Sequence, residues 1–183
     1  TIACHPMEAK KQTIEVGGVA LPLLTGDEAS WKGSSLLSAT QISTEGLKLL
    51  FQWTLQLKDV VQKEGGETSL QHKIVGTVFY EASTRTACSF KAAAMRLGAN
   101  NIHVDSEGNN SLKKGETLED TIRCLECYTD LIVLRHPQTG SVSRVIQFAE
   151  KPILNAGDGV GEHPTQALLD VFTIYDELIV QSK

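Results

Sequence analysis

Ser83, Thr84, Arg85 and Thr86 form the segment of this 183-residue chain whose residue types are best suited to binding chemistry. They follow an apolar run that ends at residue 80, and they come directly before residues with helical spacing. The first turn of a helix carries backbone N–H groups without intrahelical acceptors, and the helix dipole favours negative charge there. Hydroxyl groups and an arginine beside such a turn suit a small phosphate group. The plainer interpretation is that a serine or threonine here only caps the helix.

Two other segments carry polar groups at corresponding positions. Arg135 follows a later apolar run, and His163 and Gln166 lie in the segment NAGDGVGEHPTQ. The plain alternatives are an ordinary polar exit from a strand and a turn-rich loop with Pro164 in the first helical turn. His163 could also act as a general base, but cationic neighbours would favour its neutral form.

Apolar runs and segments with helical spacing alternate along the chain, and this order decides where the polar groups lie. Strands are expected at 73–80, 101–105, 131–134 and 152–155, and helices from about Ser43 to Gly65, around 90–97, from Thr117 onward, at 142–149 and at 163–179. The alternation predicts an α/β fold with a parallel sheet of about four strands and helices on both faces. Ligands of such sheets bind beyond the carboxyl ends of the strands. The polar segments, joined by Lys113 and Lys114 of a long loop, are therefore expected at one edge.

The composition limits the classes of partner. The chain is 41% hydrophobic and 21% charged, with a formal net charge of -5, which is typical of a globular protein and disfavours nucleic acid as a partner. Apolar runs are too short for a membrane span, and the first residues lack a secretory signal. The four cysteines make no disulfide framework in a chain of this length, so we expect reduced thiols and a cytoplasmic protein. The two common glycine-rich nucleotide motifs are missing, and no set of residues has the spacing of metal ligands, so neither a cofactor nor a metal is expected.

Residues 1–33 are interpreted as a leader or linker, and residues 34–183 as a single domain. Glycines punctuate the first segment without sustained periodicity. Within the domain, Cys124 and Cys127 have the spacing Cys-x-x-Cys but lack a second ligand pair for zinc. We expect them to be buried or half-buried thiols on one face of a helix.

Four segments in the same order resemble a known enzyme family: FYEASTRTACSF, SLKKGETLEDT, VLRHPQ and LNAGDGVGEHPTQALLD. Together they resemble the carbamoyl-phosphate half of aspartate carbamoyltransferase, and most closely the version fused into the multifunctional pyrimidine-synthesis polypeptides of eukaryotes. The resemblance covers roughly residues 36–177. It implies half of a two-domain transferase, because the second domain that holds aspartate would follow the sequence given.

The resemblance also implies a role for each matching residue. Ser83, Thr84, Arg85 and Thr86 would bind the phosphate of carbamoyl phosphate. Its carbonyl oxygen would be contacted by Thr86, Arg135 and His163, and its NH2 group by Gln166. Ser111 and Lys114 would reach into the site of a neighbouring subunit in a homotrimer, and Glu81 would pair with arginines when the two domains close. The catalytic set implied is Arg85, Thr86, Lys114, Arg135 and His163.

The reaction implied is attack of the aspartate amine on the carbamoyl carbon, followed by departure of phosphate, without metal or cofactor. A chain without the second domain is expected to bind carbamoyl phosphate or phosphate without useful turnover. The first alternative is ornithine carbamoyltransferase, but Glu162 stands where that family usually has an aromatic residue, and the loop KKGE favours aspartate. The second alternative is a non-catalytic scaffold domain of a multifunctional polypeptide.

Overall fold

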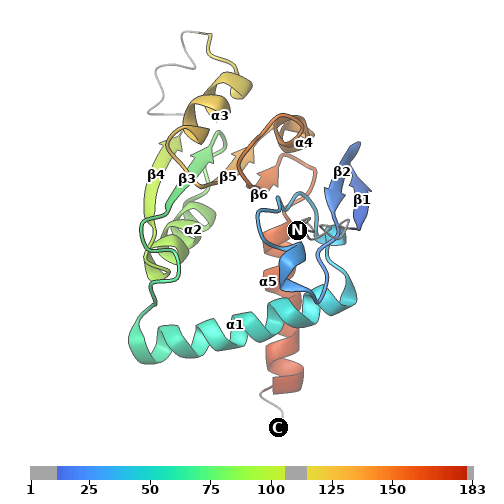
Figure 1. Cartoon of the computed structure of the whole chain (residues 1–183), viewed down its shortest axis with the longest axis vertical. Coiled ribbons are helices and arrows are strands. Elements are labelled where there is room, and N and C mark those ends of the chain that lie inside the picture. Colours follow the sequence, from blue (N-terminus) through green and yellow to red (C-terminus); the bar gives the residue numbers. More distant parts are fainter. Residues whose placement is uncertain (1–11, 106–114, 181–183) are drawn as a thin grey trace, which may run out of the picture.

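Four parallel strands form the central sheet of the structure, a computed structural model that describes residues 12–105 and 115–180 (Figure 1). The strands are β3 (Ile74–Phe79), β4 (Asn100–Asp105), β5 (Leu131–His136) and β6 (Ile153–Asp158), in the spatial order β4-β3-β5-β6. All three pairings are parallel. The predicted α/β fold with a four-stranded parallel sheet is confirmed.

The strand order creates one topological switch point. From β3 the chain first adds β4 on one side and then returns to add β5 on the other side. In the β3–β5 pair, Val78 is opposite Leu134 and Phe79 is opposite Arg135. The segments that follow these two strands therefore diverge at the carboxyl edge, which is where open α/β sheets bind ligands.

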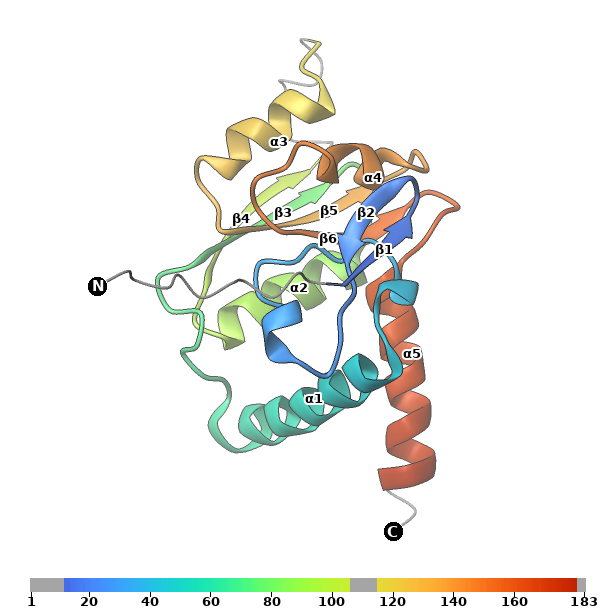
Figure 2. The ribbon, with the colours of Figure 1, turned by 45° about the vertical axis from the view of Figure 1, so that its right-hand side comes forward.

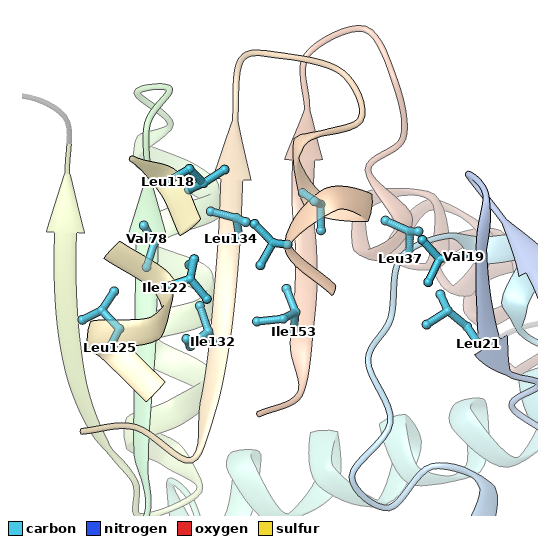
Figure 3. Close-up of a cluster of buried hydrophobic side chains, with 12 residues drawn as sticks. Val19, Leu21, Leu37, Val78, Leu118, Ile122, Leu125, Ile132, Leu134 and Ile153 are labelled. Carbon is cyan, nitrogen blue, oxygen red and sulfur yellow. The ribbon is translucent and has the colours of Figure 1, made fainter. Parts of the chain in front are cut away.

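Helices cover both faces of the sheet. The helix α2 (Thr84–Arg96) lies below the sheet in Figure 2, and α3 (Leu118–Glu126) and α4 (Ser141–Ile146) lie above it. The inner strand β5 is apolar on both sides, as a parallel strand between two helical layers must be, whereas the edge strand β4 contributes apolar side chains to one face only. On β5, Ile132 and Leu134 belong to the core under α3 and α4, and Val133 belongs to the core over α2. Figure 3 shows the first of these cores, where Ile122 of α3 packs with Ile132.

The longest helix, α1 (Thr44–Glu64), has the ends that its sequence predicts. The Ser43 side chain accepts a hydrogen bond from the Gly46 N–H at the start, and Gly65 ends the helix with a φ of 83°. The last helix, α5 (Pro164–Tyr175), continues as a π-helix over Asp176–Val180 and crosses α1 (Figure 1). Phe51 of α1 packs against Phe172 and Tyr175 there. None of the helices in the described ranges is both long and apolar enough to cross a membrane.

An N-terminal hairpin lies within the segment that we interpreted as a leader or linker. Its strands are β1 (Thr13–Val16) and β2 (Val19–Pro22), joined by Gly17 and Gly18, both with positive φ. Two glycines suit such a turn, which requires positive φ at both central residues. Val19 and Leu21 join the core under α4 (Figure 3). Strands of four residues are too short to show a periodic pattern, so the sequence did not indicate them.

The thiols of α3 depart from their predicted environment. Cys124 and Cys127 are both exposed, so the expectation of buried or half-buried thiols was wrong. The cause is the direction of the helix face, because Leu118, Ile122 and Leu125 turn toward the sheet and form its core contact. Cys124, directly before Leu125, and Cys127, at the C-cap of α3, are then directed toward solvent.

Candidate functional site

A polar cleft of about 780 Å³ opens at the switch point of the sheet. Its polar lining comes from three separate elements: Ser83, Arg85, Thr86 and Ser89 of α2 and its N-terminus, Arg135 of β5, and His163, Thr165 and Gln166 at the start of α5. Phe90, Ala93 and Leu169 complete the wall. The structure therefore brings six of the predicted site residues into one hollow, although they are spread over 84 positions of the sequence in the range Ser83–Gln166.

The α2 terminus presents free hydrogen-bonding groups to this cleft. Ser83 occupies the N-cap position, but its side chain makes no capping hydrogen bond. The first bond from this turn runs from the Ala87 N–H to the Ser83 carbonyl, so the preceding amides have no intrahelical acceptor. Arg85 is exposed beside them. The geometry favours anion binding over capping alone, because a cap would occupy the Ser83 hydroxyl.

Arg135 is held from two sides. Its Nη1 donates to the Ala156 carbonyl at 3.1 Å, and its Nη2 lies 3.1 Å from Glu81 Oε2. The side chain is only 18% exposed, and within the described part of the chain its buried Nε has no hydrogen-bond partner. A guanidinium fixed in this way presents a preorganised positive charge to an anion in the cleft.

His163 is oriented by the helix that it begins. As the N-cap of α5, its Nδ1 accepts a hydrogen bond from the Gln166 N–H at 3.4 Å, and Thr165 Oγ1 lies 3.3 Å from the same nitrogen. Because Nδ1 is an acceptor, the proton of the neutral ring is assigned to Nε2. This Nε2 is buried, and no described residue is its hydrogen-bond partner. An Nε2–H donor is thus available to a ligand.

Two effects keep the His163 ring neutral. Burial lowers its pKa below the ordinary value of 6.5, and the positive charge of Arg135 lowers the pKa further. The direction agrees with the neutral form expected from the sequence, but burial contributes more than the cationic neighbours. The arrangement suits donation of a hydrogen bond to a developing negative charge more than abstraction of a proton.

Gly157 lies between the side chains of Arg135 and His163, and the sequence analysis did not single it out. Its φ is 117°, and a Cβ atom placed on it would lie 2.9 Å from Arg135 Nη1 and 3.5 Å from His163 Cδ2. Only glycine combines this backbone conformation with this close approach. The signal in the sequence was a glycine directly after the β6 residues Asn155 and Ala156, at the edge where ligands bind.

The remaining predicted residues are placed less directly. Gln166 lines the cleft, and its Nε2 donates to Asp170 Oδ1 at 2.9 Å. Thr84 begins α2 and is exposed, without lining the cleft. Ser111 and Lys114, together with Lys113, lie outside the described residues. Within the described ranges there is no cluster of three or more side chains suited to holding a metal ion.

Comparison with protein families gives one match that covers most of the chain. Residues 34–176 match the family model described as aspartate/ornithine carbamoyltransferase, carbamoyl-P binding domain. The multifunctional protein pyr1-3 of Dictyostelium discoideum is 50% identical over 149 residues, which are 81% of this chain and 7% of that protein. The aspartate carbamoyltransferase catalytic subunit of Thermoplasma volcanium is 43% identical over 147 residues, which are 80% of this chain and 48% of that subunit.

Solved structures of aspartate transcarbamoylase from Trypanosoma cruzi share the fold. The complex with aspartate and phosphate has a TM-score of 0.79 and 42% identity, and the match covers 86% of this chain and 50% of that one. The complex with carbamoyl phosphate has a TM-score of 0.79 and 43% identity over 82% of this chain and 46% of that one. The sequence given thus spans about half the length of these single-function relatives.

Proposed function

Because the chain belongs to the aspartate/ornithine carbamoyltransferase family and covers its carbamoyl-phosphate-binding domain, we propose that the cleft at the switch point binds carbamoyl phosphate. The observation that carries the proposal is the meeting of the α2 terminus, Arg135 and His163 in one hollow. A dianionic phosphate would lie at the α2 terminus, against Ser83, Arg85 and Thr86 of the cleft wall and next to Thr84. The carbonyl oxygen would receive hydrogen bonds from Thr86, Arg135 and His163, and the NH2 group would contact Gln166.

The complete protein is proposed to transfer the carbamoyl group to the amine of aspartate, in pyrimidine synthesis in the cytoplasm. Attack on the carbamoyl carbon places negative charge on the carbonyl oxygen, and phosphate then leaves. The neutral His163 ring and the fixed Arg135 are suited to stabilise that charge, since donors that are already oriented gain the most at such a step. Holding two small reactants together supplies a further rate increase.

The aspartate site and part of the carbamoyl phosphate site would come from elsewhere in the assembly. Aspartate would bind a second domain, and Ser111 and Lys114 would enter the cleft of a neighbouring subunit in a homotrimer. Cyclic trimers close through such heterologous contacts. The 183-residue chain alone is therefore expected to bind carbamoyl phosphate without useful turnover.

Calorimetric titration of the chain with carbamoyl phosphate, and with inorganic phosphate as its simpler analogue, tests the proposal. Arg85→Ala should weaken binding of both by about tenfold or more, because a hydrogen bond to a charged group contributes ~1.5–3 kcal/mol. Arg123→Gln is a matched control, since Arg123 is exposed on α3 and stacks over Phe148 away from the cleft. A folded wild-type chain that binds neither anion would refute the assignment, as would equal affinities for the two variants.

Two further measurements test the rest of the proposal. Formation of carbamoyl aspartate by the chain alone at a rate close to that of a two-domain relative would contradict the need for a second domain. Sedimentation equilibrium over a wide concentration range tests the trimer, and a monomer at every concentration would count against a shared site.

A further inference from the structure

Asn155, a buried polar side chain within β6, makes hydrogen bonds that reach the loop before α5. It is fully buried. Its Nδ2 donates to the carbonyls of Leu37 at 2.9 Å and Glu162 at 3.2 Å, and its Oδ1 accepts from the Gly157 N–H at 2.9 Å. A buried amide satisfied at both ends is costly to disturb, because each lost partner leaves a desolvated group.

Asp158 completes the attachment of the same loop. Asp158 is buried and only 6% exposed. Its Oδ1 accepts from the Glu162 N–H at 2.8 Å, and its Oδ2 accepts from the Gly140 N–H at 3.0 Å. The backbone N–H and C=O of Glu162 are therefore both held by side chains of β6. The carbonyl of Glu162 belongs to the peptide bond that enters His163, so the position of this histidine is set at two points.

The same loop also contacts Arg135, whose positive charge faces the cleft. Ala156 accepts the Arg135 Nη1 hydrogen bond, and the Gly157 backbone lies against the Arg135 guanidinium. A displacement of residues 156–162 would therefore move the partner of Arg135 and the backbone of His163 together. Neither Asn155 nor Asp158 lines the cleft.

We propose that Asp158, with Asn155 as its partner, is a positioning residue for carbamoyl phosphate binding that acts through the backbone of Glu162 without touching the ligand. The proposal rests on the function proposed above for the cleft and names a determinant of that site. Its carboxylate form matters, because two backbone N–H groups from different loops each require one acceptor oxygen. The ring orientation of His163 depends on this arrangement, since a loosely held backbone would free the N-cap.

The test uses the variant Asp158→Asn. The asparagine side chain has the same shape as aspartate but carries an NH2 group in place of one acceptor oxygen. Asp130→Asn is the matched control, because Asp130 also accepts a backbone N–H, that of Ile74 at 2.9 Å, but at the opposite edge of the sheet. Titration with inorganic phosphate should show about tenfold weaker binding for Asp158→Asn, as expected when a binding group is misplaced by a fraction of an ångström. The control should bind like the wild type.

A second readout needs no ligand. Nitrogen-15 NMR of the histidine rings reports the tautomer of His163, with His163→Asn used to assign its signals. The wild type should show the proton on Nε2, and Asp158→Asn should show a mixture of tautomers as the N-cap contact to Nδ1 loosens. A merely structural role for Asp158 would lower the unfolding free energy and leave this ring signature unchanged.

A second variant keeps the test decisive if Asp158→Asn does not fold. A Cβ atom on the exposed Gly161 would collide with Asp158 Oδ1, so Gly161→Ala displaces the carboxylate while its charge is kept. Weaker phosphate binding and a changed tautomer in either folded variant support the proposal. Wild-type affinity and the wild-type tautomer in every folded variant overturn it. If the wild type itself binds no phosphate, the proposed function fails, and the tautomer alone decides whether Asp158 positions His163.

Discussion

Gly157→Ala is the substitution for which the structure gives the sharpest expectation. The added methyl group meets two obstacles, the backbone conformation with a φ of 117° and the guanidinium of Arg135. The first acts on the stability of the fold, and the second acts on the cleft. The two effects can be measured separately because they concern different states of the protein.

The magnitudes follow from these two contacts. An L side chain in so sparsely populated a backbone region costs about 1–3 kcal/mol, which corresponds to a fall in melting temperature of roughly 2–12 °C for a domain of this size. The new Cβ would lie 2.9 Å from Arg135 Nη1, about 0.5 Å inside ordinary van der Waals contact. Binding groups tolerate displacements of only about 0.5 Å, so we expect affinity for phosphate to fall about tenfold.

Calorimetric titration with phosphate and thermal unfolding by circular dichroism provide the two measurements. Gly65→Ala is the matched control, because Gly65 has a φ of 83° with no atom within 4 Å of the added Cβ, and it lies at the end of α1. The control should lose stability and keep its affinity. The reasoning is refuted if Gly157→Ala binds phosphate as tightly as the control does, because the contact with Arg135 would then have no effect on the site.

Three other substitutions or measurements test different parts of the structure. The lowered pKa of His163 means that the folded chain binds fewer protons than the unfolded chain as the pH decreases. The contribution of His163 to the free energy of unfolding is therefore fully present above pH 6.5 and is lost as the pH falls below that value. Urea unfolding at about pH 7.5 and about pH 5.5 measures this effect. Between these two pH values, the unfolding free energy should decrease less for His163→Asn, which keeps an N-cap acceptor, than for the wild type. Cys124 and Cys127 should be alkylated in the native chain as fast as in urea, as peptide mapping would show, and slow native labelling would contradict their exposure. Lys58→Met should cost about 1–2 kcal/mol in urea unfolding, since it removes the 2.6 Å ion pair to the buried Asp176, and no change would show that this pair is without net effect.

The sheet and its helices were predictable because their signals are local and strong. The segment that became β5 is a continuous run of Leu131, Ile132, Val133 and Leu134, and only a strand covered on both faces needs such a run. The ends of α1 were marked by a serine and a glycine whose backbone roles depend on neighbouring residues alone. The predicted helix at 142–149 is longer than α4, which ends at Ile146. The residues after Ile146 belong to the turn that leads to β6.

The site was predictable only as far as the parallel direction of the strands could be inferred. Residues directly after parallel strands must lie at one edge, so the convergence of Arg85, Arg135 and His163 followed from the alternation of elements. The contacts among them did not follow. That His163 Nδ1 caps α5, and that Gly157 lies against Arg135, depend on distances across the fold that no local pattern encodes.

The ion pair between Glu81 and Arg135 adds a further determinant of affinity, since a ligand anion must compete with it. Glu81 Oε2 lies 3.1 Å from Arg135 Nη2, and the Glu81 side chain is 42% exposed whereas that of Arg135 is 18% exposed.

Two effects of Glu81→Gln oppose each other. Loss of the charge removes the competitor and its repulsion of a dianion, whereas loss of the contact would free the guanidinium. Glutamine keeps an oxygen that can accept from Nη2, and Arg135 remains bound to the Ala156 carbonyl, so the orientation should survive. The first effect should therefore dominate, and because a half-exposed pair contributes at most ~1 kcal/mol, phosphate should bind about two- to fivefold tighter. The gain should shrink at high salt, where exposed charges are screened. Weaker binding by Glu81→Gln would mean that the carboxylate is needed to aim Arg135, and that the free cleft is organised by this pair.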